Sequence, residues 1–196
     1  MLSVKTFSYP GIWLPVIQSH FPDGTLRLEP PELSNTFASA IRWDYENDAE
    51  LFSLICLKNH YCNDNISLYM PYCPHARMDR VKSSNDVFTL KSFAGIINSL
   101  NFSKVVVYDA HSNVSLALID RVENRDNTPF VERAINKIND PDLVMYYPDE
   151  GAMKRYSEQF NRPYSFGMKK RDWATGNIKG IDIINKEAVR GKNILI

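Results

Sequence analysis

Two arginines flank an aspartate in the segment 71–80, which reads PYCPHARMDR. Arg77 and Arg80 are three residues apart, and Asp79 lies between them. Guanidinium groups bind phosphate oxygens through two parallel donors and also stack on flat rings. The segment is therefore suited to the phosphates and the base of a nucleotide. The alternative is a solvated surface turn held by an Asp–Arg pair.

Two further segments carry side chains that bind metals or sugars. Asp109 and His111 follow a run of valines and can share a divalent ion or its waters, whereas the alternative is a histidine satisfied by a backbone carbonyl. Mg²⁺ usually takes only one or two protein ligands beside phosphate oxygens, so a sparse site fits ATP chemistry without identifying it. Asp149, followed by Glu150 and Gly151, can approach a sugar hydroxyl or a metal, or it can cap a helix.

Cations gather at 169–171, where the sequence reads KKR. On a flexible segment they can close on a diphosphate and neutralise the charge that develops during its transfer. A solvated basic turn is the alternative. The sequence offers no candidate Ser–His or Cys–His nucleophile pair, and phosphoryl transfer requires none.

The pattern of apolar residues predicts the helices and strands that position these segments. Apolar residues at helical spacing indicate helices, and short apolar runs indicate strands. Helices alternating with strands favour an α/β fold with parallel strands, whose ligands lie beyond the carboxyl ends of the strands. All four polar segments are expected there, and 169–172 is expected to be a loop. The predicted helices are 48–58, 86–100, 130–138 and 151–160, and the predicted strands are 25–28, 66–70, 104–109, 142–147, 164–168 and 193–196.

Composition excludes several classes of protein. Lys plus Arg and Asp plus Glu both number 23, so no bulk charge favours nucleic acid or an acidic membrane. No apolar run approaches the ~20 residues of a membrane helix, and residues 1–5 lack the pattern of a secretory signal. Cys56, Cys62 and Cys73 show no CxxC pairing, which indicates buried, reduced thiols in a cytoplasmic protein rather than disulfides or a zinc site.

Five stretches together resemble ribose-phosphate pyrophosphokinases, also called phosphoribosyl pyrophosphate synthetases. The segment 71–80 is similar to the family's PYxxYARQDR stretch, and DAHS at 109–112 is similar to its DxHx strand end. FPDGT at 21–25 resembles the FxDGE nucleotide loop, YPDEG at 147–151 resembles the SPDxG segment, and KKR at 169–171 matches the KxR of the mobile catalytic loop. The matches follow the family's order over nearly the whole chain.

The resemblance implies a fold and a reaction. The fold would be α/β, with two tandem phosphoribosyltransferase-like (type I) domains and mainly parallel sheets, the first domain at 1–126 and a second, incomplete one at 127–196. The reaction would be Mg²⁺-dependent transfer of the β,γ-diphosphate of ATP, as one unit, to the 1-hydroxyl of ribose 5-phosphate. Its products would be phosphoribosyl pyrophosphate and AMP. A homo-oligomer is also implied, because the family assembles into rings whose ATP site spans a subunit interface.

The resemblance further implies a role for each candidate residue, with the adenine contacts coming from a neighbouring subunit. These roles are Phe21 and Asp23 for adenine, Arg77, Asp79 and Arg80 for the rest of the nucleotide, His111 and Asp149 for Mg²⁺, Asp149 again for the ribose, and Lys169 and Arg171 for the transferring diphosphoryl group.

Several positions depart from the family pattern. Met78 stands where Gln is usual, Thr25 where Glu is common, and Glu150 where a small residue is usual, the last adding charge close to the sugar. The family follows a strand like 193–196 with a DD…GT loop that holds the 5-phosphate of ribose. The sequence ends at Ile196, which favours a fragment of a longer product.

Three alternatives stay open at this point. The first is a phage-type relative that transfers the diphosphate to ADP-ribose in an NAD-rebuilding pathway in the host cytoplasm. The second is a non-catalytic regulatory homologue. The third is a phosphoribosyltransferase of the same fold.

Overall fold

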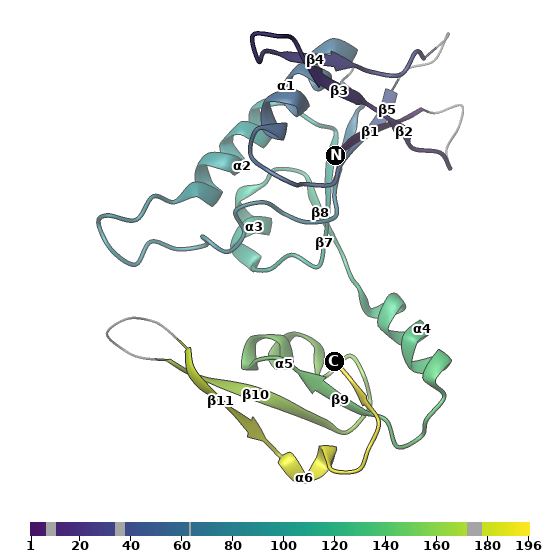
Figure 1. The fold of residues 1–196 in the computed structure, drawn as a ribbon, viewed down its shortest axis with the longest axis vertical. Coiled ribbons are helices and arrows are strands. Elements are labelled where there is room, and N and C mark those ends of the chain that lie inside the picture. Colours follow the sequence, from purple (N-terminus) through teal and green to yellow (C-terminus); the bar gives the residue numbers. More distant parts are fainter. Residues whose placement is uncertain (7–10, 34–37, 63, 172–177) are drawn as a thin grey trace. The chain divides into compact units, whose positions relative to one another are not determined.

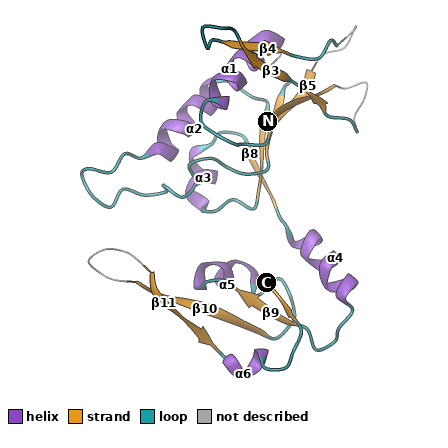
Figure 2. Ribbon diagram, viewed as in Figure 1, coloured by secondary structure: helices purple, strands orange, loops and turns teal. Residues whose placement is uncertain are grey.

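The computed structural model describes residues 1–6, 11–33, 38–62, 64–171 and 178–196. Helices and strands alternate along much of the chain (Figures 1 and 2). The chain divides into two compact units, Met1–Asp126 and Asn127–Ile196. Each unit has its own sheet and its own hydrophobic core.

The first unit is built around a sheet with the strand order β2-β1-β5-β6-β7-β8. The strands from β5 to β8 run parallel, and β1 and β2 extend the sheet antiparallel beside β5. A separate antiparallel hairpin is formed by β3 and β4. The bounds are β1 Leu2–Thr6, β2 Leu14–Pro15, β3 Ile17–His20, β4 Leu26–Glu29, β5 Ala38–Trp43, β6 Ser67–Met70, β7 Lys104–Tyr108 and β8 Val122–Arg125.

Three helices connect the parallel strands of this unit: α1 (Glu50–Tyr61), α2 (Thr89–Ser99) and α3 (Asn113–Leu118). Figure 1 shows α1 and α2 on the same side of the sheet. Leu57 of α1 and Phe93 of α2 are buried there in one core with Trp43 and Leu68. Because this core fixes the parallel ladder, the segments that follow β6 and β7 leave the sheet at the same edge.

The second unit has a smaller sheet with the order β11-β10-β9-β12. β10, β9 and β12 are parallel, and β10 and β11 form an antiparallel hairpin. Its core contains Ile135, Leu143, Met145, Tyr147 and Phe160. The bounds are α4 Thr128–Ile138, β9 Val144–Tyr147, α5 Glu150–Tyr156, β10 Tyr164–Arg171, β11 Ile178–Ile184, α6 Lys186–Val189 and β12 Ile194–Leu195.

Helix ends differ from the predicted ranges for local reasons. The helix expected at 86–100 begins at Thr89, because the Asp86 carboxylate accepts hydrogen bonds from the Lys82 and Ser83 amides at 2.8 and 3.0 Å in a preceding turn. α4 begins at residue 128 rather than 130 and takes Pro129 into its first turn, where the missing N–H is not needed. α5 ends at residue 156 rather than 160, because the chain turns there and Phe160 joins the core.

The prediction of a loop at 169–172 was wrong for the residues that the structure describes. β10 extends to Arg171, since β11 returns beside it and pairs Lys169 with Ile181 and Lys170 with Gly180. The prediction of buried thiols holds for Cys73, whereas Cys62 is exposed and Cys56 is half-buried. Within the described ranges, no helix has the length and apolar character needed to cross a membrane.

Candidate functional site

The arginine-rich segment after β6 is anchored by buried residues and presents its cations outward. Cys73 and Ala76 are buried, whereas Arg77 and Arg80 are exposed. Arg80 Nε lies 3.6 Å from the carboxylate of the half-buried Asp79. Within the described residues, Arg77 has neither a hydrogen bond nor an ion pair, so its guanidinium donors are available to a ligand.

A side-chain network that the sequence did not suggest ties this segment to the loop before α1. His75 Nε2 lies 3.0 Å from Asp48 Oδ1, and the Tyr45 hydroxyl donates to the same oxygen at 2.9 Å. The hydrogen bond to Asp48 raises the pKa of Tyr45. Tyr45 also packs against Tyr72, with ring centroids 5.8 Å apart. The two loops at this edge of the sheet are therefore coupled.

The segment after β7 is a tight turn with His111 exposed. Asp109 has a left-handed φ of 48°, and its amide donates to the Arg125 carbonyl at 2.9 Å. The next amide, of Ala110, donates to the Asn124 side chain at 3.0 Å. Ser112 then caps α3 by accepting from the Val114 amide. The fixed backbone presents His111 at the carboxyl end of β7, as the sequence predicted.

The turn of the β3-β4 hairpin holds Phe21 and Asp23. Asp23 Oδ1 accepts from the amide and the hydroxyl of Thr25 at 3.0 and 2.7 Å, and these bonds lower the pKa of the Asp23 carboxyl. Gly24 has a φ of 84°, which glycine adopts without strain. The ring of Phe21 is 50% exposed. The carboxylate thus shapes the turn, and the ring is accessible for stacking on a flat partner.

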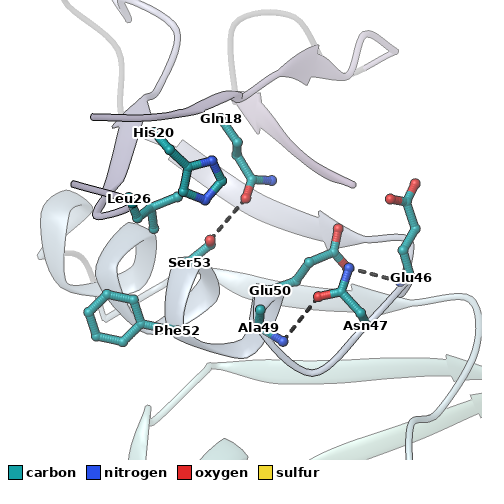
Figure 3. A pocket seen from close by; sticks show the side chains of 10 residues that line it. Gln18, His20, Leu26, Glu46, Asn47, Ala49, Glu50, Phe52 and Ser53 are labelled. Carbon is teal, nitrogen blue, oxygen red and sulfur yellow. Dashed lines mark hydrogen bonds between the residues drawn. The ribbon is translucent and has the colours of Figure 1, made fainter. Parts of the chain in front are cut away.

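An open pocket of about 450 Å³ lies between this hairpin and the start of α1 (Figure 3). Gln18 and His20 come from the hairpin, whereas Phe52 and Ser53 come from the helix. Ser53 donates to the Gln18 side chain at 2.9 Å across the pocket. Sequence reasoning missed this pocket, because its walls come from separate elements and its residue types form no motif.

In the second unit, Asp149 has two partners. Its Oδ1 accepts from the Ala152 amide at 2.9 Å, which caps α5, and its Oδ2 pairs with Lys169 Nζ at 2.6 Å. The Lys169 ammonium and then the Ala152 amide lower the pKa of the carboxyl. Glu150 pairs instead with Lys154, one turn along α5. The cap interpretation of Asp149 is therefore correct, and the same carboxylate also fixes a cation on β10.

The cations at 169–171 lie on a strand, so neighbouring side chains point to opposite faces. Lys169 reaches Asp149, whereas Lys170 pairs with Asp182 of β11 at 2.7 Å. Only the backbone of Arg171 is described, and 172–177 lie outside the described residues.

The structure brings some predicted residues together and leaves others in different units. Lys169 and Asp149 are in direct contact. The arginine-rich segment and His111 follow neighbouring strands of the first unit, and Phe21 and Asp23 share its hairpin. No group of three or more His, Cys, Asp or Glu side chains that could hold a metal occurs in the described ranges. A site for Mg²⁺ needs fewer protein ligands than that.

Comparison with curated proteins finds sequence relatives that are named ribose-phosphate pyrophosphokinase. It is 25% identical over 185 residues to the ribose-phosphate pyrophosphokinase of Sulfurisphaera tokodaii, covering 90% of this chain and 63% of that protein. It is 27% identical over 169 residues to the ribose-phosphate pyrophosphokinase of Sulfolobus acidocaldarius, covering 81% of this chain and 57% of that protein. No protein-family model matches the chain.

A solved structure shows the same fold. The crystal structure of phosphoribosylpyrophosphate synthetase from Mycobacterium smegmatis superposes with a TM-score of 0.69 at 16% identity, covering 92% of this chain and 61% of that one. This likeness confirms the predicted α/β fold with mainly parallel sheets. The curated relatives confirm the resemblance to ribose-phosphate pyrophosphokinases in sequence, and the solved structure confirms it in fold. The chain spans between about half and two thirds of the length of those relatives.

Proposed function

We propose that the protein transfers the β,γ-diphosphate of ATP to the 1-hydroxyl of ribose 5-phosphate, giving phosphoribosyl pyrophosphate and AMP. The observation that carries this proposal is the contact of Lys169 with Asp149 at 2.6 Å, which joins the predicted catalytic cation to the predicted ribose-binding carboxylate. The names of the curated relatives support the class of reaction. ATP, Mg²⁺, ribose 5-phosphate and a cytoplasmic location all belong to the proposal.

The nucleotide is held by the arginine-rich segment. Arg77 and Arg80 are exposed on a backbone that buried neighbours fix, so both guanidinium groups can meet phosphate oxygens or the base. Asp79 orients Arg80 from 3.6 Å. Phe21 and Asp23 of a second copy contact the adenine in this proposal, which therefore includes a homo-oligomer. The exposed ring of Phe21 supports that role.

Lys169 and Arg171 stabilise the transferring group. An ammonium has three donors, and Asp149 accepts from one of them, so Lys169 keeps two for the oxygens of the diphosphate. A cation already fixed by a carboxylate needs little reorganisation when charge spreads over those oxygens in the transition state. The loss of one such contact raises the barrier by about 3–4 kcal/mol.

His111 and Asp149 are each proposed as ligands of Mg²⁺. The carboxylate of Asp149 has about four lone-pair positions, and the Ala152 amide and Lys169 use two of them. His111 is exposed at the end of β7. Each residue by itself fits the small share of ligands that a protein gives to Mg²⁺ beside ATP. When bound, the ion neutralises charge on the phosphates. Asp149 additionally accepts from a ribose hydroxyl in this proposal.

The two compact units support a division into domains. We propose that 1–126 forms one domain, with the loops of the ATP site, and that 127–196 belongs to a second, with the transfer residues.

AMP release from Mg-ATP tests the proposal, with ribose 5-phosphate and ADP-ribose supplied in separate reactions and the product identified by mass. AMP with ribose 5-phosphate is the expected result. AMP with ADP-ribose alone would keep the reaction class and replace the acceptor. ATP binding without AMP from either acceptor would contradict the proposal and favour the non-catalytic homologue.

A further inference from the structure

Gly167 of β10 lies where the strand meets the segment that follows β9. A Cβ atom at this position would lie 2.8 Å from the Pro148 carbonyl oxygen, 3.0 Å from Ile181 Cγ2 and 3.1 Å from the Tyr146 hydroxyl. The first of these is a backbone atom, which cannot move aside as the end of a flexible side chain can. The approach of Pro148 to β10 therefore requires glycine at 167.

This contact occurs where the ladder between β9 and β10 ends. The last paired residues are Tyr147 and Phe166, so Pro148 and Gly167 come next on each strand. Proline has no N–H, so residue 148 cannot donate a hydrogen bond to the ladder. At this position the Pro148 carbonyl lies close against Gly167 of β10.

The contact of Pro148 with Gly167 is close in sequence to two residues of the proposed site. Asp149 directly follows Pro148, and Lys169 lies two residues beyond Gly167, on the same face of β10. The distance between the Asp149 and Lys169 backbones is therefore set by how closely Pro148 approaches the strand. Their side chains meet at 2.6 Å.

The requirement for glycine applies to position 167 of β10 and not to the glycine of the partner strand β11. Gly180 of β11 lies opposite Lys170, and a Cβ there would have no atom within 4 Å. Packing therefore does not require glycine at position 180. Gly180 offers a matched control for any effect of an added methyl group.

We propose that Gly167 is a positioning residue, whose missing side chain lets the Pro148 carbonyl close on β10 and so sets the Asp149–Lys169 pair. This inference rests on the proposed function, because that pair is taken as the site of transfer.

The first test is independent of activity. Asp149→Asn, Lys169→Met and the double variant form a cycle that measures the coupling of the two side chains through urea unfolding. The cycle is repeated on Gly167→Ala and on Gly180→Ala backgrounds. We expect coupling in the parent and in Gly180→Ala, and coupling within error of zero in Gly167→Ala. Undiminished coupling in Gly167→Ala would overturn the inference, whether or not the chain releases AMP.

The second test is the AMP assay. If Lys169 is displaced, its contact with the transferring group weakens more in the transition state than in the complex with bound substrate. Gly167→Ala should therefore lower kcat by roughly tenfold with little change in KM for ATP. Gly180→Ala should leave both unchanged. Lost coupling with unchanged kcat would remove the positioning role and leave the proposed function standing. A parent chain that binds ATP and releases no AMP would instead overturn the proposed function and, with it, the catalytic part of the inference.

A second variant keeps the inference testable if Gly167→Ala alone does not fold. Ile181 is 54% exposed, so Ile181→Ala is tolerable and removes the Cγ2 atom next to position 167. In the double variant Gly167→Ala/Ile181→Ala, the added methyl group still meets the Pro148 carbonyl. Loss of coupling there, with coupling kept in Ile181→Ala, supports the inference, and equal coupling in both contradicts it.

Discussion

Lys169 and Lys170 are sequence neighbours with different partners. Lys169 reaches Asp149 at the start of α5, whereas Lys170 pairs with Asp182 across the hairpin. On a strand, adjacent side chains lie on opposite faces, so only one of the two lysines can face Asp149. The proposed role in transfer therefore belongs to Lys169 and not to its neighbour Lys170.

The first prediction compares these lysines. Lys169→Ala should lower kcat for AMP release by roughly 10²–10³-fold, with a much smaller effect on ATP affinity, because its contact strengthens as charge develops. Lys170→Ala should change kcat little. Steady-state kinetics and ATP titration measure both quantities. Equal losses in kcat and affinity for Lys169→Ala would make it a simple binding residue.

The second prediction concerns the thiols. Burial raises the pKa of Cys73 to about 11, so about 0.1% of it is thiolate at pH 8. Cys62 is exposed at the end of α1. Iodoacetamide at pH 8 should alkylate Cys62 and spare Cys73, as read by mass spectrometry of peptides. Denatured chain, in which both thiols react, is the control. Rapid labelling of native Cys73 would contradict its burial.

Residue types and their spacing indicated candidate site residues, but they did not indicate which of these residues contact one another. Asp149 was assigned either a cap or a ligand role from its place before Gly151, and the cap is observed. The contact of His75 with Asp48 joins residues 27 apart in sequence, and no local pattern encodes it. Only the tertiary fold brings such residues together.

At the scale of elements, α5 depends on the side chain that also meets Lys169. Asp149 is the N-cap residue of this helix. Asparagine can replace the cap oxygen, whereas alanine cannot. The two substitutions therefore separate the cap from the ion pair.

The third prediction uses this pair of variants. Asp149→Ala should unfold with a free energy about 1 kcal/mol below that of Asp149→Asn, because only alanine loses the cap. Urea unfolding at pH 7 measures the difference, and Asp182→Asn is a control for loss of a strand ion pair without a cap. Equal stability of the alanine and asparagine variants would show that the cap contributes nothing.

The fourth prediction follows from the lowered pKa of Asp149. The ordinary pKa of an aspartate carboxyl is 3.8, and the Lys169 ammonium and then the Ala152 amide lower the pKa of Asp149 in the folded chain. The ionised carboxylate therefore stabilises the fold fully above the unfolded pKa, and this contribution disappears as pH falls through the folded pKa. The stability difference between the parent and Asp149→Asn should shrink as pH drops below 3.8. A difference that grows in acid would give the shift the opposite sign.

Sequence periodicity predicted the parallel ladder better than the antiparallel additions. The run of valines in β7 and the helical spacing of apolar residues in α2 are clear sequence patterns. The sequence prediction ended β10 at residue 168, because the lysines that follow are polar. In the structure, pairing with β11 continues the strand. Tertiary pairing outweighed local polarity there, as β-propensity often depends on neighbours.

At the scale of the whole molecule, the two units have separate cores. The buried cluster of the first unit extends from Leu2 to Ile119, and that of the second from Ile135 to Phe160. A chain of the first unit's size can bury about two thirds of its unfolded surface, which is enough for independent folding.

The fifth prediction tests this separation with residues 1–126 alone. Trp43 is 1% exposed in the first core, so its emission reports whether that core forms. The shortened chain should show blue-shifted emission and a single cooperative urea transition, because none of its core residues lies beyond 126. A Trp43→Phe variant assigns the signal against Trp13. Gradual unfolding with red-shifted emission would mean that the first core needs residues 127–196, and the proposed domain boundary would then be wrong.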